Sequence, residues 1–206
     1  MIEQSPILVT GIPRSGASMI AATIKHCGAF TGDLSKRSMY TNTTIKEELV
    51  SSYLKMLEVN HSYNWNWKED VEFILSRQGW KGEIWMYKDS NISKMWKVWA
   101  SAYPNAKYVI VRRKTTDVIE SCMKTGYMKE HSTREGWLGM VHAYENNFVE
   151  MITEGLNCKV IWPERMVNGD YNQLYELCDW IGLPWKEDAL KFIDTLLWKS
   201  RQLERR

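Results

Sequence analysis

The strongest structural signal in the chain is Ile7-Leu8-Val9-Thr10-Gly11-Ile12-Pro13-Arg14-Ser15-Gly16-Ala17-Ser18. It begins with an apolar run of three residues, and beyond it Ile20, Ile24 and Cys27 recur at helical spacing. The pattern predicts a strand, a loop and a helix in succession between residues 7 and 27. A connection of this kind places the loop at the carboxyl end of a strand and at the N-terminus of a helix.

The loop has the size of a phosphate-binding loop. Gly11 and Gly16 bracket four residues, and glycines in such loops let backbone N–H groups close on an anion at the start of a helix. A loop that binds Mg-nucleoside triphosphate has a lysine after the second glycine, but this chain has Ala17 there and its only loop cation is Arg14. We therefore expect phosphate binding without the usual Mg-nucleotide arrangement.

Composition narrows the class of protein. The 206 residues suffice for one well-buried domain, which we expect to span residues 1–206. A net charge of +2 argues against a general nucleic-acid or membrane binder. The four cysteines are far apart in sequence and form no C-x-x-C pair, which predicts neither a zinc site nor a disulfide framework. With no secretory leader pattern at the N-terminus, we expect a cytoplasmic protein.

Strand patterns alternate with helix patterns along the rest of the chain. Further strands are predicted at residues 83–87, 107–111 and 158–162, and helices at 45–57, 67–75, 92–103, 174–181 and 190–197. Two more helices should begin at cap patterns, Asp117 with Glu120 and Ser132 with Glu135, and Asn91 is a predicted cap as well. This order predicts an α/β fold, a single-domain parallel sheet flanked by helices.

Cations follow three of the predicted strands. Arg14 comes after the first strand, Lys88 after the second and Arg113 after the third, while Ser121 falls in the first turn of the helix that follows Arg113. The carboxyl ends of parallel strands share one edge of the sheet, where α/β proteins bind ligands. The sequence therefore predicts one anion site, with Arg113 and Ser121 facing the same anion.

These segments resemble the sulfotransferase family, whose members use 3′-phosphoadenosine-5′-phosphosulfate (PAPS). Pro13-Arg14-Ser15-Gly16-Ala17-Ser18 is similar to the family's 5′-phosphosulfate loop, and Arg113 with Ser121 keeps the spacing of its 3′-phosphate motif. Lys88-Asp89-Ser90 looks like the Lys-Asp-Pro segment of the tyrosylprotein and bacterial members that use a carboxylate base. The likeness covers roughly the whole chain. It implies a fold like that of P-loop NTPases and transfer of a sulfuryl group from PAPS to a hydroxyl or amine acceptor.

The resemblance also implies roles for individual residues. Residues 13–18, Arg113 and Ser121 would bind PAPS, and Arg14 and Lys88 would supply the positive charge for transfer, so that no metal is needed. Because Ser90 stands where cytosolic members have a histidine, the base must be another group. Carboxylate-type relatives place it after the first helix, which favours Glu47, then Asp33, with Glu48 as a further choice.

Two other functions stay open. A binding protein could hold a 3′-phosphonucleotide without turnover, since Ala17 removes a hydroxyl that the family usually has at this position. A P-loop phosphotransferase or nucleotide kinase is the other alternative, although it lacks the expected lysine. The acceptor, whether a small molecule, a glycan or a peptide, and the oligomeric state are not determined by the sequence. Trp65 and Trp67 suit an aryl or sugar acceptor, but core packing is the favoured role.

Overall fold

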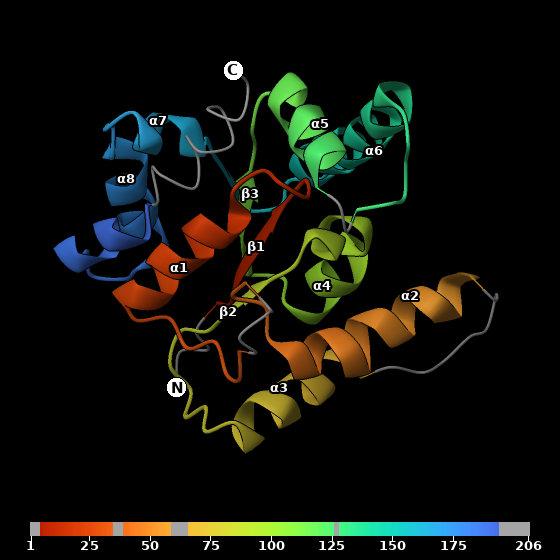
Figure 1. Cartoon of the computed structure of the whole chain (residues 1–206). Helices are drawn as coiled ribbons and strands as arrows, with labels where there is room; N and C mark the ends of the chain where they lie inside the picture. The colour runs from red at the N-terminus through yellow and green to blue at the C-terminus, as the bar shows by residue number, and fades with distance from the viewer. Residues whose placement is uncertain (1–4, 35–38, 59–65, 126–127, 194–206) are drawn as a thin grey trace.

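Four parallel strands form the centre of the protein. The computed structural model describes residues 5–34, 39–58, 66–125 and 128–193. Its strands are β1 (Ile7–Gly11), β2 (Met86–Lys88), β3 (Lys107–Val111) and β4 (Cys158–Ile161), in the spatial order β2-β1-β3-β4 (Figure 1). The parallel sheet confirms the predicted α/β class, while the extent of a single domain over residues 1–206 stays a prediction.

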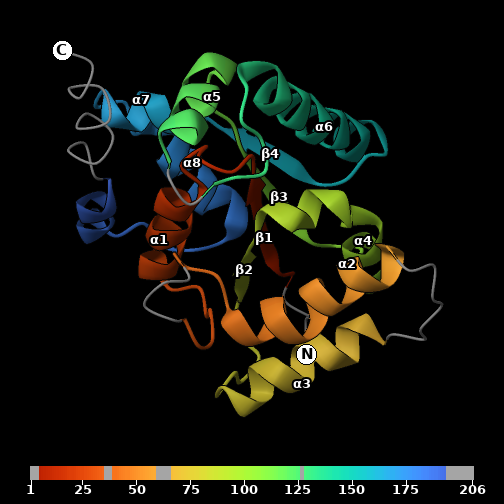
Figure 2. The same cartoon turned by 45° about the vertical axis from the view of Figure 1, so that its right-hand side comes forward.

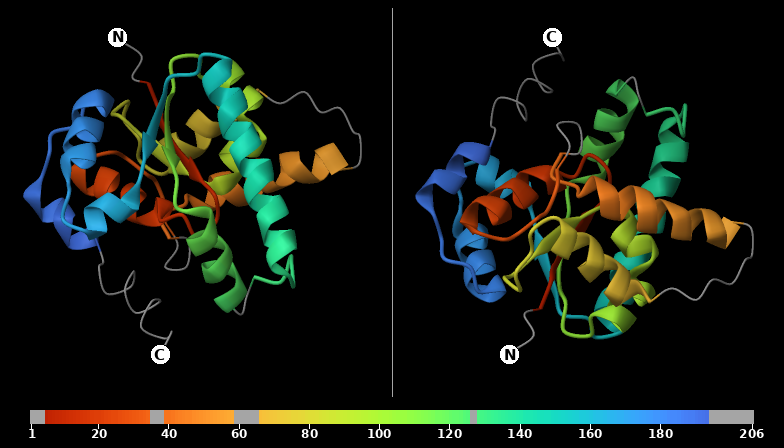
Figure 3. Two further views of the ribbon diagram at one scale, coloured as in Figure 1. Left: turned by 90° about the horizontal axis from the view of Figure 1, so that it is seen from above. Right: turned by 90° about the horizontal axis from the view of Figure 1, so that it is seen from below.

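Helices cover both faces of the sheet, as Figures 2 and 3 show. Successive strand residues point to opposite faces, so Leu8 packs into one apolar cluster while Ile7 and Val9 pack into the other. The Leu8 face is covered by η1 (Ile45–Val50), α3 (Trp67–Arg77), η2 (Ser90–Lys94), α4 (Trp96–Ala102), α5 (Thr115–Lys124) and α6 (Arg134–Thr153). The opposite face is covered by α1 (Ala17–Cys27), α7 (Pro163–Val167) and α8 (Asn172–Ile181).

Several predicted helices and strands differ from the structure, either in their end residues or in being divided into two elements. The second strand begins at Met86 rather than at residue 83, and Trp85 makes only an isolated parallel bridge to Phe30. The predicted helix at 45–57 is divided into the π-helical η1 and α2 (Ser51–Glu58). The last predicted helix is the 3₁₀ segment η3 (Glu187–Phe192), and the remainder of that prediction lies outside the described residues.

The predicted caps were wrong at three positions. Asp89, not Asn91, caps η2, since its carboxylate accepts the N–H of Asn91 at 2.7 Å. Thr133, not Ser132, caps α6 by accepting the N–H of Gly136. Helix α5 begins at Thr115, two residues before the predicted Asp117 cap. Competing Ser, Thr and Asp residues lie side by side in these turns, and the local backbone decides which side chain faces the open N–H group.

The fold brings two distant cysteines together. The thiols of Cys27, at the end of α1, and Cys178, in α8, lie 3.7 Å apart as buried free cysteines. Burial, with the neighbouring thiol as a second cause, raises the pKa of Cys178 to about 12. Cys178 donates its S–H to the sulfur of Cys27, so the two thiols form a buried contact between α1 and α8. Among the residues that the structure describes, no helix is long and apolar enough to cross a membrane.

Candidate functional site

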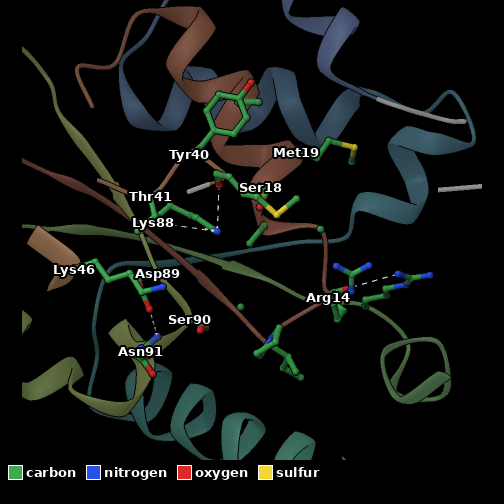
Figure 4. A pocket seen from close by; sticks show the side chains of 18 of the residues that line it. Arg14, Ser18, Met19, Tyr40, Thr41, Lys46, Lys88, Asp89, Ser90 and Asn91 are labelled. Carbon is green, nitrogen blue, oxygen red and sulfur yellow. Dashed lines mark hydrogen bonds between the residues drawn. The ribbon is translucent and has the colours of Figure 1, made fainter. Parts of the chain in front are cut away.

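A cavity of about 710 Å³ opens at the carboxyl ends of β1, β2 and β3 (Figure 4). Its volume is within the range of roughly 300–1,000 Å³ that is usual for small-ligand sites. The charged side chains that line it are mostly cations: Arg14, Lys46, Lys88, Arg113 and Lys191, against the carboxylates of Asp89 and Glu130. An excess of positive charge in a concave site favours an anionic ligand.

The loop between β1 and α1 forms the floor of this cavity. Arg14 and Gly16 have left-handed backbone conformations, with φ of 74° and 98°, and the N–H of Ser15 donates to the carbonyl of Ile12 at 2.9 Å. A Cβ on Gly11 would approach the Val111 carbonyl oxygen to 2.6 Å, so the chain needs glycine there. The loop ends at the start of α1, where the first backbone N–H groups of a helix have no carbonyl of their own helix to pair with. They are suited to bind an anion.

The two predicted phosphate contacts form one connected group. Arg14 donates from Nε to the hydroxyl of Ser121 at 3.0 Å, and Arg113 donates from Nη1 to the carbonyl of Arg14 at 3.3 Å. Arg113 is 7% exposed, and its Nε lies 4.0 Å from a carboxylate oxygen of Asp117. Ser121 lies in the middle of α5, not in the first turn as predicted. These contacts hold the two guanidinium groups at one end of the cavity.

Arg112, the neighbour of Arg113, is directed away from the cavity. Its guanidinium makes two contacts with the Glu145 carboxylate, at 3.1 Å and 2.6 Å, and lies 5.1 Å from the centre of the Trp162 ring. Side chains of residues that are adjacent at the end of an extended strand point to opposite sides. Arg113 therefore lines the cavity, and Arg112 holds α6 to the end of β3.

Lys88 lies across the cavity from Arg14 (Figure 4). Its Nζ donates to the carbonyl of Met39 at 3.3 Å and to the hydroxyl of Thr41 at 3.4 Å, as the dashed lines in Figure 4 mark. Burial lowers the pKa of this ammonium group, an effect that Asp89 opposes and the nearby charge of Lys46 increases. The amine is thus a cation with few water neighbours, and a bound anion would stabilise its charge.

Asp89 has a structural role beside Lys88. The carboxylate is 4% exposed, accepts the N–H of Asn91 at 2.7 Å and accepts the hydroxyl of Tyr87 at 3.5 Å. Burial, together with the negative charge of Asp89, holds the pKa of Tyr87 well above its usual value. These contacts fix the turn that follows β2 and thereby the direction of Lys88.

The structure brings together most of the predicted site residues. The residues that line the cavity are Pro13, Arg14, Gly16, Ala17, Ser18, Lys88 and Arg113, while Ser15 is buried in the loop and Ser121 contacts Arg14. The two predicted bases do not line it. Glu47 and Asp33 are exposed outside the cavity, and the carboxylates in the lining are Asp89 and Glu130.

Several residues that line the cavity were not predicted from the sequence. Tyr40, Thr41 and Lys46 follow a loop without a motif, and Phe192 comes from η3 near the other end of the chain. The helical pattern of residues 45–57 was visible, but it indicated only which residues face the core. No group of three or more His, Cys, Asp or Glu side chains that could hold a metal occurs in the part of the chain that the structure describes.

Comparisons with known proteins point to one family and one fold. The model of a family described as the sulfotransferase family matches residues 6–187. Among solved structures, the sulfotransferase domain of the olefin synthase from Synechococcus PCC 7002 is similar with a TM-score of 0.62 and 17% identity, over 90% of this chain and 75% of that one.

Two mycobacterial structures share the fold at lower identity. Sulfotransferase STF9 from Mycobacterium avium has a TM-score of 0.58 and 12% identity, over 100% of this chain and 70% of that one. STF1 from Mycobacterium tuberculosis H37Rv has a TM-score of 0.55 and 11% identity, over 96% and 76%. A search of curated proteins finds no match to this chain.

Proposed function

Because the chain belongs to the sulfotransferase family, we propose that it transfers the sulfuryl group of PAPS to a hydroxyl or amine acceptor. The observation that carries the proposal is the convergence of Arg14, Lys88 and Arg113 from three neighbouring strand ends on one cavity. A nucleotide with phosphate groups at both ends of its ribose needs positive charge at two separated points, and this cavity has it.

Each cation has a place in the proposed reaction. The loop and Arg14 would bind the 5′-phosphosulfate and stabilise the oxygen that leaves, and Arg113 with Ser121 would bind the 3′-phosphate. Lys88 would stabilise negative charge on the group in transfer. Sulfuryl transfer is an in-line displacement between two oxygens, so fixed charge and positioning are the main contributions that the protein makes.

The acceptor hydroxyl must also lose its proton. Glu47 and Asp33 remain the predicted bases, although their carboxylates lie outside the lining, and Asp89 is the carboxylate nearest in sequence to Lys88. The variants Glu47→Gln and Asp33→Asn test the prediction, because loss of a general base lowers kcat by roughly 10²–10⁴. A kcat that neither variant changes would remove both residues from the mechanism.

Ligand-dependent melting followed by a transfer assay tests the proposed function. Adenosine 3′,5′-bisphosphate should raise the melting temperature more than ATP with magnesium does, since a ligand that binds only the folded state stabilises it by mass action. Labelled PAPS should then transfer label to a member of an acceptor panel. Binding without transfer to any acceptor would favour the non-catalytic alternative. An equal or larger shift with Mg-ATP would favour a P-loop phosphotransferase.

A further inference from the structure

Two cations of the cavity, Lys46 and Lys191, have no role in binding or transferring the sulfuryl donor. Lys46 lies in η1 and lines the same end of the cavity as Lys88 (Figure 4). We propose that Lys46 binds an acidic group of the acceptor, a carboxylate, sulfate or phosphate close to the hydroxyl that is modified. The inference rests on the proposed function and narrows its acceptor class.

The contacts of the other lining cations set Lys46 apart. Arg14, Lys88 and Arg113 hydrogen-bond to the protein, and Lys191 forms an ion pair of 2.7 Å with Asp188. Within the described ranges of the chain, the ammonium of Lys46 makes neither an ion pair nor a hydrogen bond. Within the described residues, the Lys46 ammonium group at the cavity therefore has no protein partner to neutralise its charge.

A buried amide network fixes the backbone that carries Lys46. Asn42 is 1% exposed; its Nδ2 donates to the Thr31 carbonyl at 3.0 Å and to Gln78 Oε1 at 2.6 Å, and its Oδ1 accepts the N–H of Ile45 at 3.2 Å. The carbonyl of Asn42 accepts the N–H of Lys46 at 3.1 Å. The side chain and the backbone carbonyl of Asn42 thus both anchor the start of η1. These bonds hold the Cα of Lys46 in place.

The π-helical turn contributes to the direction of Lys46. The carbonyl of Lys46 accepts the N–H of Ser51, five residues later, and the segment is buried at Ile45 and Leu49. Single π-helical turns are rare and occur often at functional sites. Lys46, Glu47 and Glu48 are all exposed, but of the three only Lys46 lines the cavity.

The charges of Lys46 and Lys88 both influence a ligand at the same end of the cavity. The charge of Lys46 is one of the causes that lower the pKa of Lys88, so the two ammonium groups repel each other across this end of the cavity. An anion near both would relieve that repulsion. Thr41, Ser90 and Asn91 supply polar atoms around it. This environment favours an acidic acceptor and disfavours a cationic one.

Matched acceptor pairs test the inference. Phenolic, alkyl and sugar hydroxyl compounds, each as the carboxylate and as its neutral amide, are assayed with labelled PAPS, after binding of adenosine 3′,5′-bisphosphate has been verified. We expect the carboxylate member to have the higher kcat/KM. Lys46→Ala should reduce that preference about tenfold, which corresponds to about 1.4 kcal/mol. Lys46→Glu should reverse it, and Lys46→Arg should keep it.

The controls separate this inference from the proposed function. Lys55→Ala removes an exposed lysine of α2 outside the lining and should leave the preference unchanged. Equal rates for carboxylate and amide, a preference unchanged by Lys46→Ala, or turnover of no carboxylate member despite intact bisphosphate binding would each overturn the inference. Failure to bind the bisphosphate would instead contradict the proposed function.

Discussion

Replacement of Asn42 by alanine should both destabilise the protein and weaken its use of an acidic acceptor. The side chain of Asn42 makes three hydrogen bonds, with Thr31, Gln78 and Ile45, and it is almost fully buried. Alanine removes all three and leaves the buried N–H of Ile45 without this acceptor. Because the same side chain anchors the start of η1, the position of Lys46 should become less well defined.

The size of the effect follows from these contacts. A hydrogen bond contributes about 1 kcal/mol net, so three lost bonds lower the free energy of unfolding by about 3 kcal/mol. In a protein of this size each kcal/mol changes the melting temperature by about 2–4 °C. Asn42→Ala should therefore melt about 6–12 °C below the unmodified protein.

Asn66→Ala is the matched control. Asn66 is exposed at the start of α3, and its side chain makes no capping hydrogen bond. Differential scanning calorimetry on both variants should show a clear loss for Asn42→Ala and almost none for Asn66→Ala. A loss below about 1 kcal/mol at Asn42, or equal losses at the two positions, would show that these three hydrogen bonds contribute little to the free energy of unfolding.

The remaining predictions concern the cavity and the loop beside it. Lys88→Ala should lower kcat by about 10²–10³ while the bisphosphate still binds, because the charge acts where negative charge develops; normal turnover would contradict this role. Arg113→Ala should mainly raise KM, with about 1.5–3 kcal/mol lost for a charged hydrogen bond, and unchanged binding of PAPS would exclude the contact. Since burial lowers the pKa of Lys88 in the ligand-free protein, kcat/KM should fall as the pH rises through that lowered value, and Lys88→Arg should move the decline in the pH–rate profile to higher pH. Gly32→Ala should lower the melting temperature, because its Cβ would lie 1.9 Å from Gln78 Oε1 in a backbone with φ of 61°; an unchanged melting temperature would show that the loop readjusts.

The sheet and its helices were predictable because burial leaves a strong periodic pattern. The β3 boundaries agree with the predicted residues 107–111, and the helix predicted after Ser132 is α6, which buries Trp137, Val141, Tyr144, Phe148 and Met151. The parallel order could be inferred because strands alternate with helices along the chain. These features depend on many residues at once, so a single unusual side chain does not change them.

Individual side-chain directions near the cavity were less predictable. In a helix each residue is rotated by about 100° from the last, so Lys46 and Glu47 face different directions although they are neighbours. The apolar residues Ile45 and Leu49 indicated the buried face but not which adjacent residue meets the ligand. Asn42, at the start of η1, is held by Thr31 and Gln78, which come from other parts of the chain.

The strand order β2-β1-β3 fixes the separation of two cations that we propose contact the ligand. Lys88 ends β2 and Arg113 follows β3, so their backbones are separated by two strand spacings, about 10 Å. Backbone hydrogen bonds set this spacing. Substitution of Lys88 or Arg113 can change how strongly a ligand is bound, but the distance between the two backbone positions stays the same. Nucleotides that carry their second phosphate at another ribose position should therefore be rejected by length, even when their total charge is equal.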